Sequence, residues 1–585
     1  NAGIRIWQTS EHDSIGYSDG ETVERRLLEA LRQCRDLSST SDEVRQQIVD
    51  WPSEYHFSPL RHALLRPFSF SPSDRILEFG CGCGAITRYL GETGATVVAV
   101  EGNRLRAQIA AERCRDLPNV RVICDNLEDF EIPERFDTVT LIGVLEYAPV
   151  FVSGEQTVQR CLQKARQSLA AGGNLLLAIE NQLGLKYFAG CAEDHIGLPF
   201  FGIEQLYGER TVVTFGRRAL AEALASSGLD QLQWYYPFPD YKLPRVIVSD
   251  AAMTSPDFDV ATLLLRTCSR DYRGAWLRTF DETLARRVVW RNGLLGDLAN
   301  SFLIVASECA PKDSHQPFLA KAYNLSRQPQ FCTEATFSRD ESDRIYINRA
   351  YVDAGGRKIQ NSELGRITHQ LPTEDYVTGQ LLLEELHALA RHGWSLERLS
   401  CWAAPWLASL RNNSCPDRPD LLPPQFVDFT PFNAIRCEQG KITYIDAEWK
   451  ANEPIPLKWV FIRGLAYSLD NVMQPIDHGS DRRSLIVEIG TRLQLTLGDE
   501  DFVNAEQWEV ALQCYSGPQK AACGGLASVL DRPPGRTVPI HGALTEAVDA
   551  LTENTNSRSW RITKPLRWGL KLVQAVVATI RHDRR

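Results

Sequence analysis

The sequence predicts an α/β fold in the first half of the chain, an α+β domain in the second half and an amphipathic helix at the C-terminus. From Asp74 to about Val248, short apolar runs alternate with helical stretches, which is typical of a parallel sheet covered by helices. A later block holds consecutive apolar runs joined by polar turns. Residues 557–585 combine basic and apolar side chains at helical spacing.

Five apolar runs are the predicted strands of the first sheet, at 75–79, 96–100, 120–124, 138–144 and 174–179. Residues 301–307 are predicted to open a new β-rich region, which continues through 318–323, 331–337 and 344–351. Residues 280–295 and 379–392 are predicted helices.

A chain of 585 residues is too long for a single hydrophobic core, so several domains are expected. The predicted domains are an N-terminal helical extension, an α/β domain, a helical linker, an α+β domain, a helical segment and a basic tail. Their boundaries are 1–50, 51–250, 251–300, 301–500, 501–556 and 557–585.

Composition narrows the class of protein and its setting. A net charge of −10 argues against nucleic acid as the main partner, because a polyanion needs a basic surface. The 15 cysteines follow no regular spacing, which favours reduced thiols and a cytoplasmic location. A secretory signal and an apolar stretch long enough to span a bilayer are not expected from the sequence.

The strongest motif is ILEFGCGCGA at 76–85, a buried strand that runs into a glycine turn and then a helix. Gly80, Gly82 and Gly84 remove side chains where a backbone must approach a ligand closely. The turn alone also satisfies a dinucleotide-binding fingerprint, and a purely structural turn is a further alternative.

Acidic residues at successive strand ends shift the balance towards S-adenosylmethionine (SAM). Glu78 would repel a pyrophosphate but can support the cationic methionine end of SAM. Glu101 is placed to accept hydrogen bonds from ribose hydroxyls, and Asp125-Asn126 suits the adenine edge. These side chains are expected to converge at the carboxyl edge of the sheet, where open α/β folds bind ligands.

Candidate catalytic residues for the methyl acceptor lie outside this motif. Tyr55 and His56 precede the first predicted strand, whereas Glu180 follows the fifth and His195 lies in an insertion after it. A phosphate or carboxylate acceptor is already anionic, but a sugar hydroxyl needs a nearby base. Each residue also has a structural alternative, such as strand termination or a satisfied loop histidine.

A second constellation lies near residue 430. Asp428, Asn433 and Asp446 are spaced like the catalytic loop and metal-binding aspartate of protein kinases and of aminoglycoside or choline phosphotransferases. This resemblance implies that Asp428 accepts the substrate hydroxyl proton, while Asn433 and Asp446 hold Mg²⁺ on the phosphates of ATP.

The second half departs from the kinase pattern in several places. NLSRQPQ at 324–330 replaces the glycine-rich phosphate loop, and Arg349 stands where a nucleotide-binding lysine belongs. Phe426 replaces the usual histidine, and Glu363 is the nearest match to the glutamate that pairs with the lysine. A polar hairpin with unrelated acids and an inactive kinase-like domain remain alternatives.

The basic tail contains SWRITKPLRW at 559–568 within 557–585, followed by a helix-like segment at 566–580. A basic amphipathic helix with tryptophan is typical of a membrane interface, although docking on a protein is the alternative. The sequence therefore predicts a peripheral position at the inner face of the cytoplasmic membrane.

Long motifs make the chain resemble the class I SAM-dependent methyltransferases of bacterial surface-polysaccharide clusters. They are YHxSxxR at 55–61, LEFGCGCGAITRYL at 77–90, IGVLEYA at 142–148, AIENQLGLKYFAG at 178–190 and YPFPDYKLP at 236–244. The kinase-like second half is similar to the companion domain of O-antigen chain terminators, which phosphorylate and methylate the end of a lipid-linked glycan. The resemblance implies SAM, ATP and Mg²⁺ as cofactors, a glycan of O-antigen or capsule as substrate, and a glycosyltransferase as a partner. A non-catalytic glycan- or partner-binding second domain and an assembly scaffold are the alternatives.

Overall fold

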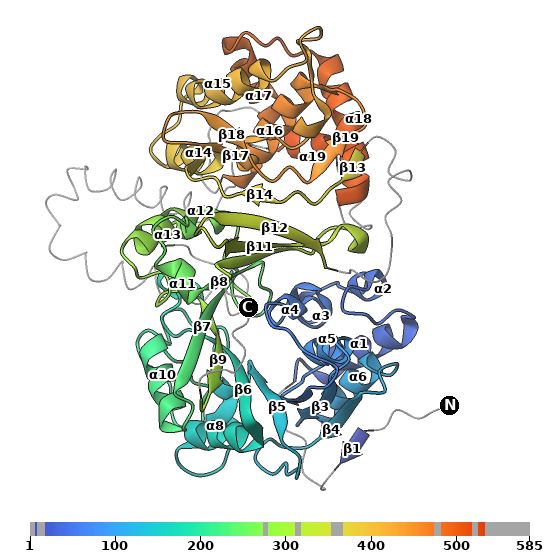
Figure 1. The fold of residues 1–585 in the computed structure, drawn as a ribbon, viewed down its shortest axis with the longest axis vertical. Helices are drawn as coiled ribbons and strands as arrows, with labels where there is room; N and C mark the ends of the chain where they lie inside the picture. Colours follow the sequence, from blue (N-terminus) through green and yellow to red (C-terminus); the bar gives the residue numbers. More distant parts are fainter. Residues whose placement is uncertain are drawn as a thin grey trace, which may run out of the picture.

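The computed structural model describes residues 18–272, 279–309, 318–352, 367–472, 481–516 and 525–532, together with the backbone of 6–8. The described part forms two stacked halves (Figure 1). A large mixed sheet with flanking helices fills the lower half, and helices dominate the upper half. The basic tail at 557–585, most of the segment at 501–556 and Glu363 lie outside the described residues.

Most of the described strands belong to one sheet of thirteen, in the order β1-β4-β3-β2-β5-β6-β9-β7-β8-β10-β11-β12-β14. Its first five strands in sequence after β1 are β2 (Arg75–Phe79), β3 (Thr96–Glu101), β4 (Val120–Cys124), β5 (Phe136–Ile142) and β6 (Leu169–Glu180). These five run parallel, as the alternating pattern predicts. The order β4-β3-β2-β5-β6 reverses at β2, so β2 and β5 flank the switch point where an open α/β sheet binds ligands. The N-terminal part therefore has the predicted Rossmann-like fold.

Helices cover both faces of this sheet (Figure 1). The longer ones are α1 (Glu21–Gln33), α5 (Ala85–Glu92), α6 (Arg104–Arg113), α8 (Thr157–Ser168) and α10 (Arg217–Ser226). The Asn103 side chain caps α6 by accepting from the backbone N–H groups of Leu105 and Arg106. Helix α1, in the predicted N-terminal extension, packs on α6. The extension also contains α2 (Asp42–Arg45) and, as an edge strand parallel to β4, β1 (Ile6–Gln8).

The prediction that residues 301–307 open a second domain is wrong. These residues form β9 (Ser301–Ser307), which lies between β6 and β7 (Gln231–Phe238) and is antiparallel to both. Every residue of β9 is buried, and the strand completes the first sheet. An apolar run of this kind predicts a buried strand but carries no information about its partners. Here the partners in β7 lie at least 68 positions earlier in the chain, and those in β6 lie still further away.

The predicted linker at 251–300 contains α11 (Asp250–Met253), α12 (Val260–Leu263) and α13 (Glu282–Arg291). After β9, the chain forms β10 (Ala320–Asn324), β11 (Thr333–Arg339), β12 (Ile345–Tyr351) and β14 (Glu374–Asp375), all antiparallel. Strand β10 pairs with β8 (Val246–Ser249), so these strands extend the first sheet instead of starting a separate one.

The upper half is built on six helices of the described chain: α14 (Leu382–Arg391), α15 (Leu396–Asn412), α16 (Leu457–Asn471), α17 (Arg482–Arg492), α18 (Asp499–Ser516) and α19 (Leu526–Leu530). Trp406, Trp459 and Phe461 lie at the centre of their shared core. Two short antiparallel strands, β17 (Ala434–Arg436) and β18 (Ile442–Tyr444), form a hairpin beside these helices.

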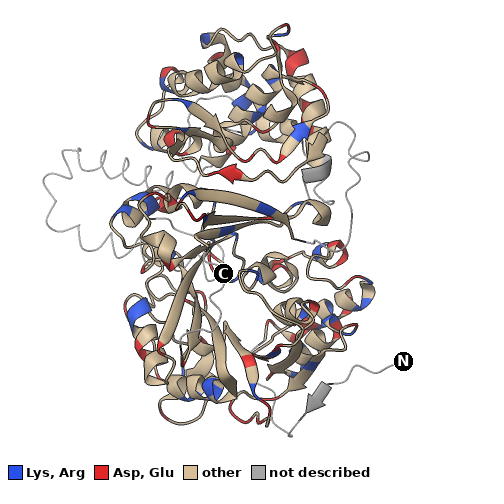
Figure 2. Ribbon diagram, in the orientation of Figure 1, with Lys and Arg blue, Asp and Glu red and all other residues tan. Residues whose placement is uncertain are grey.

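Figure 2 shows acidic and basic residues interspersed over both halves of the described ribbon. None of the helices in the described ranges has both the length and the apolar character needed to cross a bilayer.

Candidate functional site

A cavity opens at the carboxyl ends of β2, β3, β4 and β5. Among its lining residues are eight of the predicted ones: Tyr55, His56, Glu78, Gly80, Gly82, Glu101, Asp125 and Asn126. Gly84 is not part of the lining and instead forms the N-cap of α5. The predicted convergence of the three strand-end acids is therefore present in the structure.

The glycine turn needs glycine for three different reasons. Gly80, Gly82 and Gly84 all have positive φ, at 70°, 55° and 78°. A Cβ on Gly80 would lie 2.4 Å from Cγ2 of Val144, and one on Gly84 would lie 2.8 Å from the Cα of Ala110. A Cβ on Gly82 would meet no atom within 4 Å, so at this residue the backbone itself faces the cavity.

Glu101 is fixed at the rim of the cavity by two backbone donors. Its Oε2 accepts from the N–H of Gly82 at 2.8 Å, and its Oε1 accepts from the N–H of Asn103 at 2.9 Å. Burial raises the pKa of this carboxyl above its ordinary value, although both backbone donors lower it. The side chain therefore ties the glycine turn to the end of β3.

Glu78 lies at the floor of the cavity and is 3% exposed. Its Oε2 has no hydrogen-bond partner among the described residues. Burial raises the pKa of this carboxyl to about 7. A buried acceptor without a donor costs free energy, and the ammonium group of an amino-acid ligand would satisfy it. The residues present therefore fit the methionine end of SAM.

Tyr55 and His56 lie on the short helix α3 (Trp51–Phe57). His56 Nε2 lies 3.0 Å from Oδ2 of Asp19, and burial lowers the pKa of the imidazole below its usual value. His56 is consequently neutral at pH 7, with its Nε2–H donated to Asp19 and Nδ1 left as an acceptor. This pairing with Asp19 was not predicted, because the two residues are far apart in sequence.

Sequence reasoning also missed Arg61, which lines the same cavity. Its Nη1 donates to the backbone oxygens of Tyr241 at 3.3 Å and Lys242 at 3.1 Å. The guanidinium lies 4.5 Å from the centre of the Tyr55 ring. Because the YHxSxxR motif contains Arg61, the sequence marked this residue as a candidate. The motif gave no indication that the Arg61 side chain faces the cavity.

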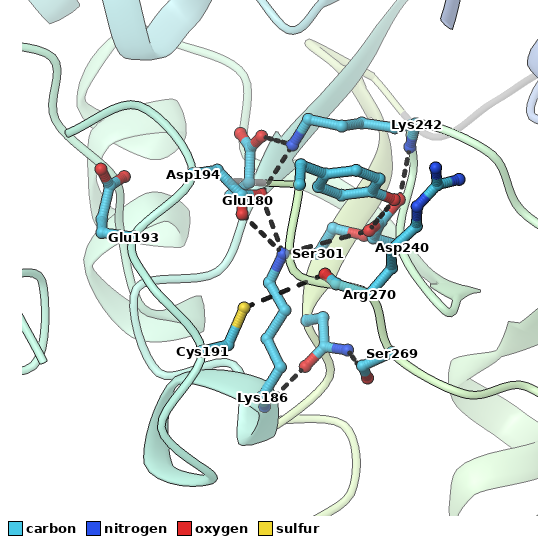
Figure 3. Close-up of polar contacts among 12 residues, drawn as sticks. Glu180, Lys186, Cys191, Glu193, Asp194, Asp240, Lys242, Ser269, Arg270 and Ser301 are labelled. Atoms are coloured by element: carbon cyan, nitrogen blue, oxygen red, sulfur yellow. Dashed lines mark hydrogen bonds and ion pairs between the residues drawn. The ribbon is translucent and has the colours of Figure 1, made fainter. Parts of the chain in front are cut away.

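Behind the cavity lies a buried ion-pair network (Figure 3). Lys242 Nζ contacts Oε1 of Glu180 and lies 2.7 Å from Oδ2 of Asp194. Lys186 Nζ donates to both Asp194 oxygens, at 2.9 and 2.8 Å. Although burial alone would raise it, the charges of Lys242 and His195 hold the pKa of Glu180 well below its usual range. Glu180 is therefore a permanently ionised member of this network.

His195 belongs to the same network and does not line the cavity. Its Nε2 lies 3.4 Å from Oε2 of Glu180, and its Nδ1 lies 3.0 Å from the hydroxyl of Tyr147. Burial opposes protonation, but the Glu180 carboxylate raises the pKa of His195 to about 9. A protonated imidazole cannot accept a proton, so this geometry favours a positioning role for His195 and Glu180. Tyr147 does line the cavity, and its place in the LEYA motif was the available signal.

Glu146, Glu180 and His195 each bring one ligand atom to within 4.8 Å of the others, a grouping that can hold a metal ion. Lys242 already contacts Glu180, and its ammonium would repel a cation at this position.

A second cavity, of about 480 Å³, lies between the strands β10–β12 and the helical half. It brings together three predicted residues, Arg349, Asn433 and Asp446, from β12, the segment before β17 and the segment after β18. Arg349 Nη2 lies 3.0 Å from Oδ1 of Asp446 and 3.1 Å from Oε2 of Glu374. Glu374 thus pairs with Arg349, a role that the sequence assigned to Glu363.

Asp428 lies next to this cavity but is not among its lining residues. Its Oδ2 accepts from Nδ2 of Asn433 at 2.8 Å, and its Oδ1 contacts Nη1 of Arg463. The carboxylate of Asp446 and the amide oxygen of Asn433 are oxygen donors of the kind that Mg²⁺ prefers.

The first half also matches known proteins. Residues 77–175 match the family model described as methyltransferase domain, so this part of the chain is a methyltransferase domain. The glycine turn, Glu78 and Glu101 lie within this matched segment and line the cavity described above, whose residues fit SAM.

Curated relatives align over short stretches. Ribosomal RNA small subunit methyltransferase A of Thermotoga petrophila is 35% identical over 75 residues, which are 12% of this chain and 28% of the relative. Demethylmenaquinone methyltransferase of Tropheryma whipplei is 27% identical over 118 residues, which are 20% of this chain and 46% of the relative. The chain thus spans less than half the length of these relatives.

Solved structures resemble the same region. Phosphoethanolamine N-methyltransferase 2 of Haemonchus contortus, in complex with SAM, is 16% identical with a TM-score of 0.28, over 48% of this chain and 60% of that one. A SAM-dependent methyltransferase of Thermotoga maritima, described as a possible histamine N-methyltransferase, is 14% identical with a TM-score of 0.26, over 44% and 91%.

Proposed function

We propose that this protein transfers the methyl group of SAM to a bacterial surface glycan, of O-antigen or capsule, at a terminal sugar or sugar phosphate. The observation that carries the proposal is the single cavity that holds Glu78, Glu101 and Asp125 around the glycine turn. The glycan class rests on the long motifs at 55–61, 178–190 and 236–244.

Each end of SAM has a matching group in the cavity. Glu78 would accept from the ammonium, and Arg61 would pair with the carboxylate. Glu101 would bind the ribose hydroxyls, and Asp125 with Asn126 the adenine edge. Bound SAM supplies an electrophilic methyl group, and the protein's task is to align the acceptor with it.

The acceptor would enter beside Tyr55 and Tyr147, which line the same cavity. Of the two nearby histidines, only His56 is neutral and held by a carboxylate, so His56 is the group that can take a proton from a sugar hydroxyl. Protonated His195 would hold the Tyr147 hydroxyl in place. An acceptor phosphate would need neither proton transfer nor His56.

Replacing His56 therefore distinguishes the two acceptors. With a sugar hydroxyl as acceptor, His56→Ala is expected to lower kcat about 100-fold or more, while SAM affinity changes little. Methyl transfer would be measured with labelled SAM and isolated glycan. An unchanged kcat would contradict the hydroxyl and leave a phosphate as the acceptor.

Mass spectrometry of the surface glycan tests the activity as a whole. We expect cells with the wild-type protein to carry a methylated glycan terminus, and cells with Glu101→Ala to lack it, because this variant loses the ribose ligand and the anchor of the glycine turn. The purified protein should show SAM-dependent thermal stabilisation, about 2.7 kcal/mol at 100 times Kd. The absence of stabilisation by SAM would contradict the proposal and favour an assembly scaffold.

The pKa of Glu78 predicts how SAM affinity depends on pH. The Glu78 carboxyl has a pKa of about 7 when the cavity is empty, so below pH 7 it is mostly protonated. In that range it must lose its proton before it can bind the ammonium group of SAM. Kd is expected to tighten about tenfold per pH unit up to that pKa and then level off. Above about pH 8 it weakens again as the α-amino group of SAM loses its proton. Calorimetry across this range checks the profile, and Glu78→Gln should remove its acidic limb while weakening binding overall.

The second cavity favours an additional activity, phosphoryl transfer from ATP to the same glycan terminus. It rests on Arg349, Asn433 and Asp446 lining one cavity, with Asp428 bonded to Asn433. Asp446 and Asn433 would hold Mg²⁺, which neutralises charge on the transferred phosphoryl group when bound. Asp428 would orient the hydroxyl once its contact with Arg463 opens. The alternative is a non-catalytic glycan- or partner-binding module.

Measuring ATP consumption with Mg²⁺ and isolated glycan distinguishes phosphoryl transfer from a non-catalytic binding module. Asp446→Asn is expected to abolish glycan-dependent ATP consumption, because it removes the charged metal ligand, and to leave SAM binding intact. Arg418→Gln, at an exposed pair with Asp420, is the control. If Asp446→Asn and Asp428→Ala leave ATP consumption unchanged, the second activity is wrong.

The proposal includes a place in the cell. A lipid-linked glycan would be met at the inner face of the cytoplasmic membrane, with a glycosyltransferase as partner and the basic segment 557–585 as the membrane contact. Binding of the full chain to vesicles with anionic lipid, compared with a chain ending at residue 556, tests this part.

A further inference from the structure

The second cavity is lined by groups of both charges, but these groups are unevenly paired. Three arginines line it: Arg245, Arg266 and Arg349. Arg349 is balanced by Glu374 and Asp446. Neither of the other two has a carboxylate within 4.0 Å or a side-chain hydrogen bond anywhere in the described ranges. The third acid of the lining, Glu448, pairs with Arg327 and Arg349, so Arg245 and Arg266 form a positive region of the cavity without an acid partner.

Backbone hydrogen bonds fix the main chain of Arg245, and a ring contact holds the side chain of Arg266. The N–H of Arg245 donates to the oxygen of Phe238 at 2.7 Å, and its own oxygen accepts from Tyr323 at 2.8 Å, so β7 and β10 hold its backbone. The guanidinium of Arg266 lies 5.3 Å from the centre of the Phe432 ring, next to Asn433. Partial desolvation and the nearby charge of Arg266 lower the pKa of Arg245, although both side chains are exposed at the mouth of the cavity. Two cations that repel each other in a concave surface are an arrangement that an anion would relieve.

The position of Arg245 points to the phosphate end of the cavity. Tyr323, which bonds its backbone, directly precedes Asn324, the first residue of the segment that replaces a glycine-rich phosphate loop. The arginine of that segment, Arg327, is buried and does not line the cavity, and it pairs at 2.5 Å with Glu448, which does. The loop therefore lacks both its glycines and a cation directed into the cavity.

We propose that Arg245 and Arg266 bind the phosphate groups of a ligand in this cavity, the polyphosphate of a nucleoside triphosphate, in place of a glycine-rich loop. This inference rests on the second activity proposed above, because it names the groups that hold its phosphate donor. Planar guanidinium groups suit phosphate oxygens, since they donate two parallel hydrogen bonds. Arg245 precedes β8 and Arg266 follows α12, whereas Asn433 and Asp446 of the same cavity belong to the helical half, so the ligand would bridge the two halves.

The test is calorimetric binding of Mg-ATP, adenosine and tripolyphosphate to the full-length protein. Arg245→Gln/Arg266→Gln is expected to weaken Mg-ATP and tripolyphosphate about tenfold or more and to leave adenosine unchanged. The affinity of wild type should fall steeply with salt, and that of the variant much less. The matched control is Arg344→Gln/Arg418→Gln, which removes two exposed arginines paired outside the cavity.

The outcomes separate this inference from the proposed activity. If the variant binds Mg-ATP and tripolyphosphate as tightly as wild type, or if wild type binds neither, the inference is overturned. Arginine-dependent binding of Mg-ATP without any turnover supports the phosphate site while contradicting phosphoryl transfer. Glucose 1-phosphate is the further probe: tighter arginine-dependent binding of it than of Mg-ATP would overturn the nucleotide assignment. SAM-induced stabilisation of each variant reports that the fold is intact.

Discussion

Lys242→Met is expected to destabilise the protein by about 3–5 kcal/mol, the largest effect of any single substitution considered for this chain. Lys242 is 9% exposed, and its ammonium is the charge that contacts both Glu180 and Asp194. Methionine keeps the length of the stem but removes one of the positive charges that compensate the two buried carboxylates, beside which His195 and Lys186 remain. Chemical denaturation at pH 7 would measure the loss.

A second substitution makes the reason testable. If uncompensated charge is the cause, adding Glu180→Gln to Lys242→Met should restore part of the stability, so the two changes should be non-additive. Lys458→Met removes a lysine from a partly exposed pair with Asp501 and should cost at most about 1 kcal/mol. Equal losses for Lys242→Met and Lys458→Met would contradict a buried network.

Gly84→Ala is expected to destabilise the first domain by about 2–5 kcal/mol. Its φ of 78° already disfavours a side chain. The new Cβ would lie 2.8 Å from the Cα of Ala110, which is backbone and cannot rotate away. Helices α5 and α6 would have to separate, and SAM binding would be lost with the turn. Denaturation and calorimetry would record both losses.

Gly82→Ala tests the contribution of the same turn to SAM binding separately from its contribution to helix packing. Its Cβ would meet no protein atom within 4 Å and would project into the cavity, so stability should fall by only the conformational cost of about 1–2 kcal/mol. SAM affinity should nevertheless fall about tenfold or more, because the methyl group occupies ligand space. Gly293→Ala, with a φ of 70° and open space, is the control for the conformational cost alone. SAM affinity that survives Gly82→Ala would place the cofactor elsewhere.

The first domain was largely predictable because its signals are local. The five apolar runs form β2 to β6, and the glycine turn lies between β2 and α5 as the motif requires. Because the carboxyl ends of parallel strands share one edge, the convergence of Glu78, Glu101 and Asp125 could also be expected.

Pairings across long separations were not predictable. Three-dimensional placement decides the link between His56 and Asp19, the stabilisation of protonated His195 by the Glu180 carboxylate, and the pairing of Arg349 with Glu374. Sequence identified the residue types at His56, Glu180 and His195 but not their environment, and environment sets the pKa on which a role as acid or base depends.

The positions of the strands and helices of the first domain, and the turn that faces a ligand, follow from the sequence alone. Backbone preferences and the spacing of apolar residues are local properties that extend over only a few residues. Only the tertiary structure decided that Ser301–Ser307 completes the first sheet and that β10 extends it through β8. It also decided that Arg245 and Arg266 lie in the second cavity without an acid. Strand pairing and ion pairing depend on which distant segments lie side by side in the fold. The same set of apolar runs is compatible with several strand orders, so local sequence does not select one of them.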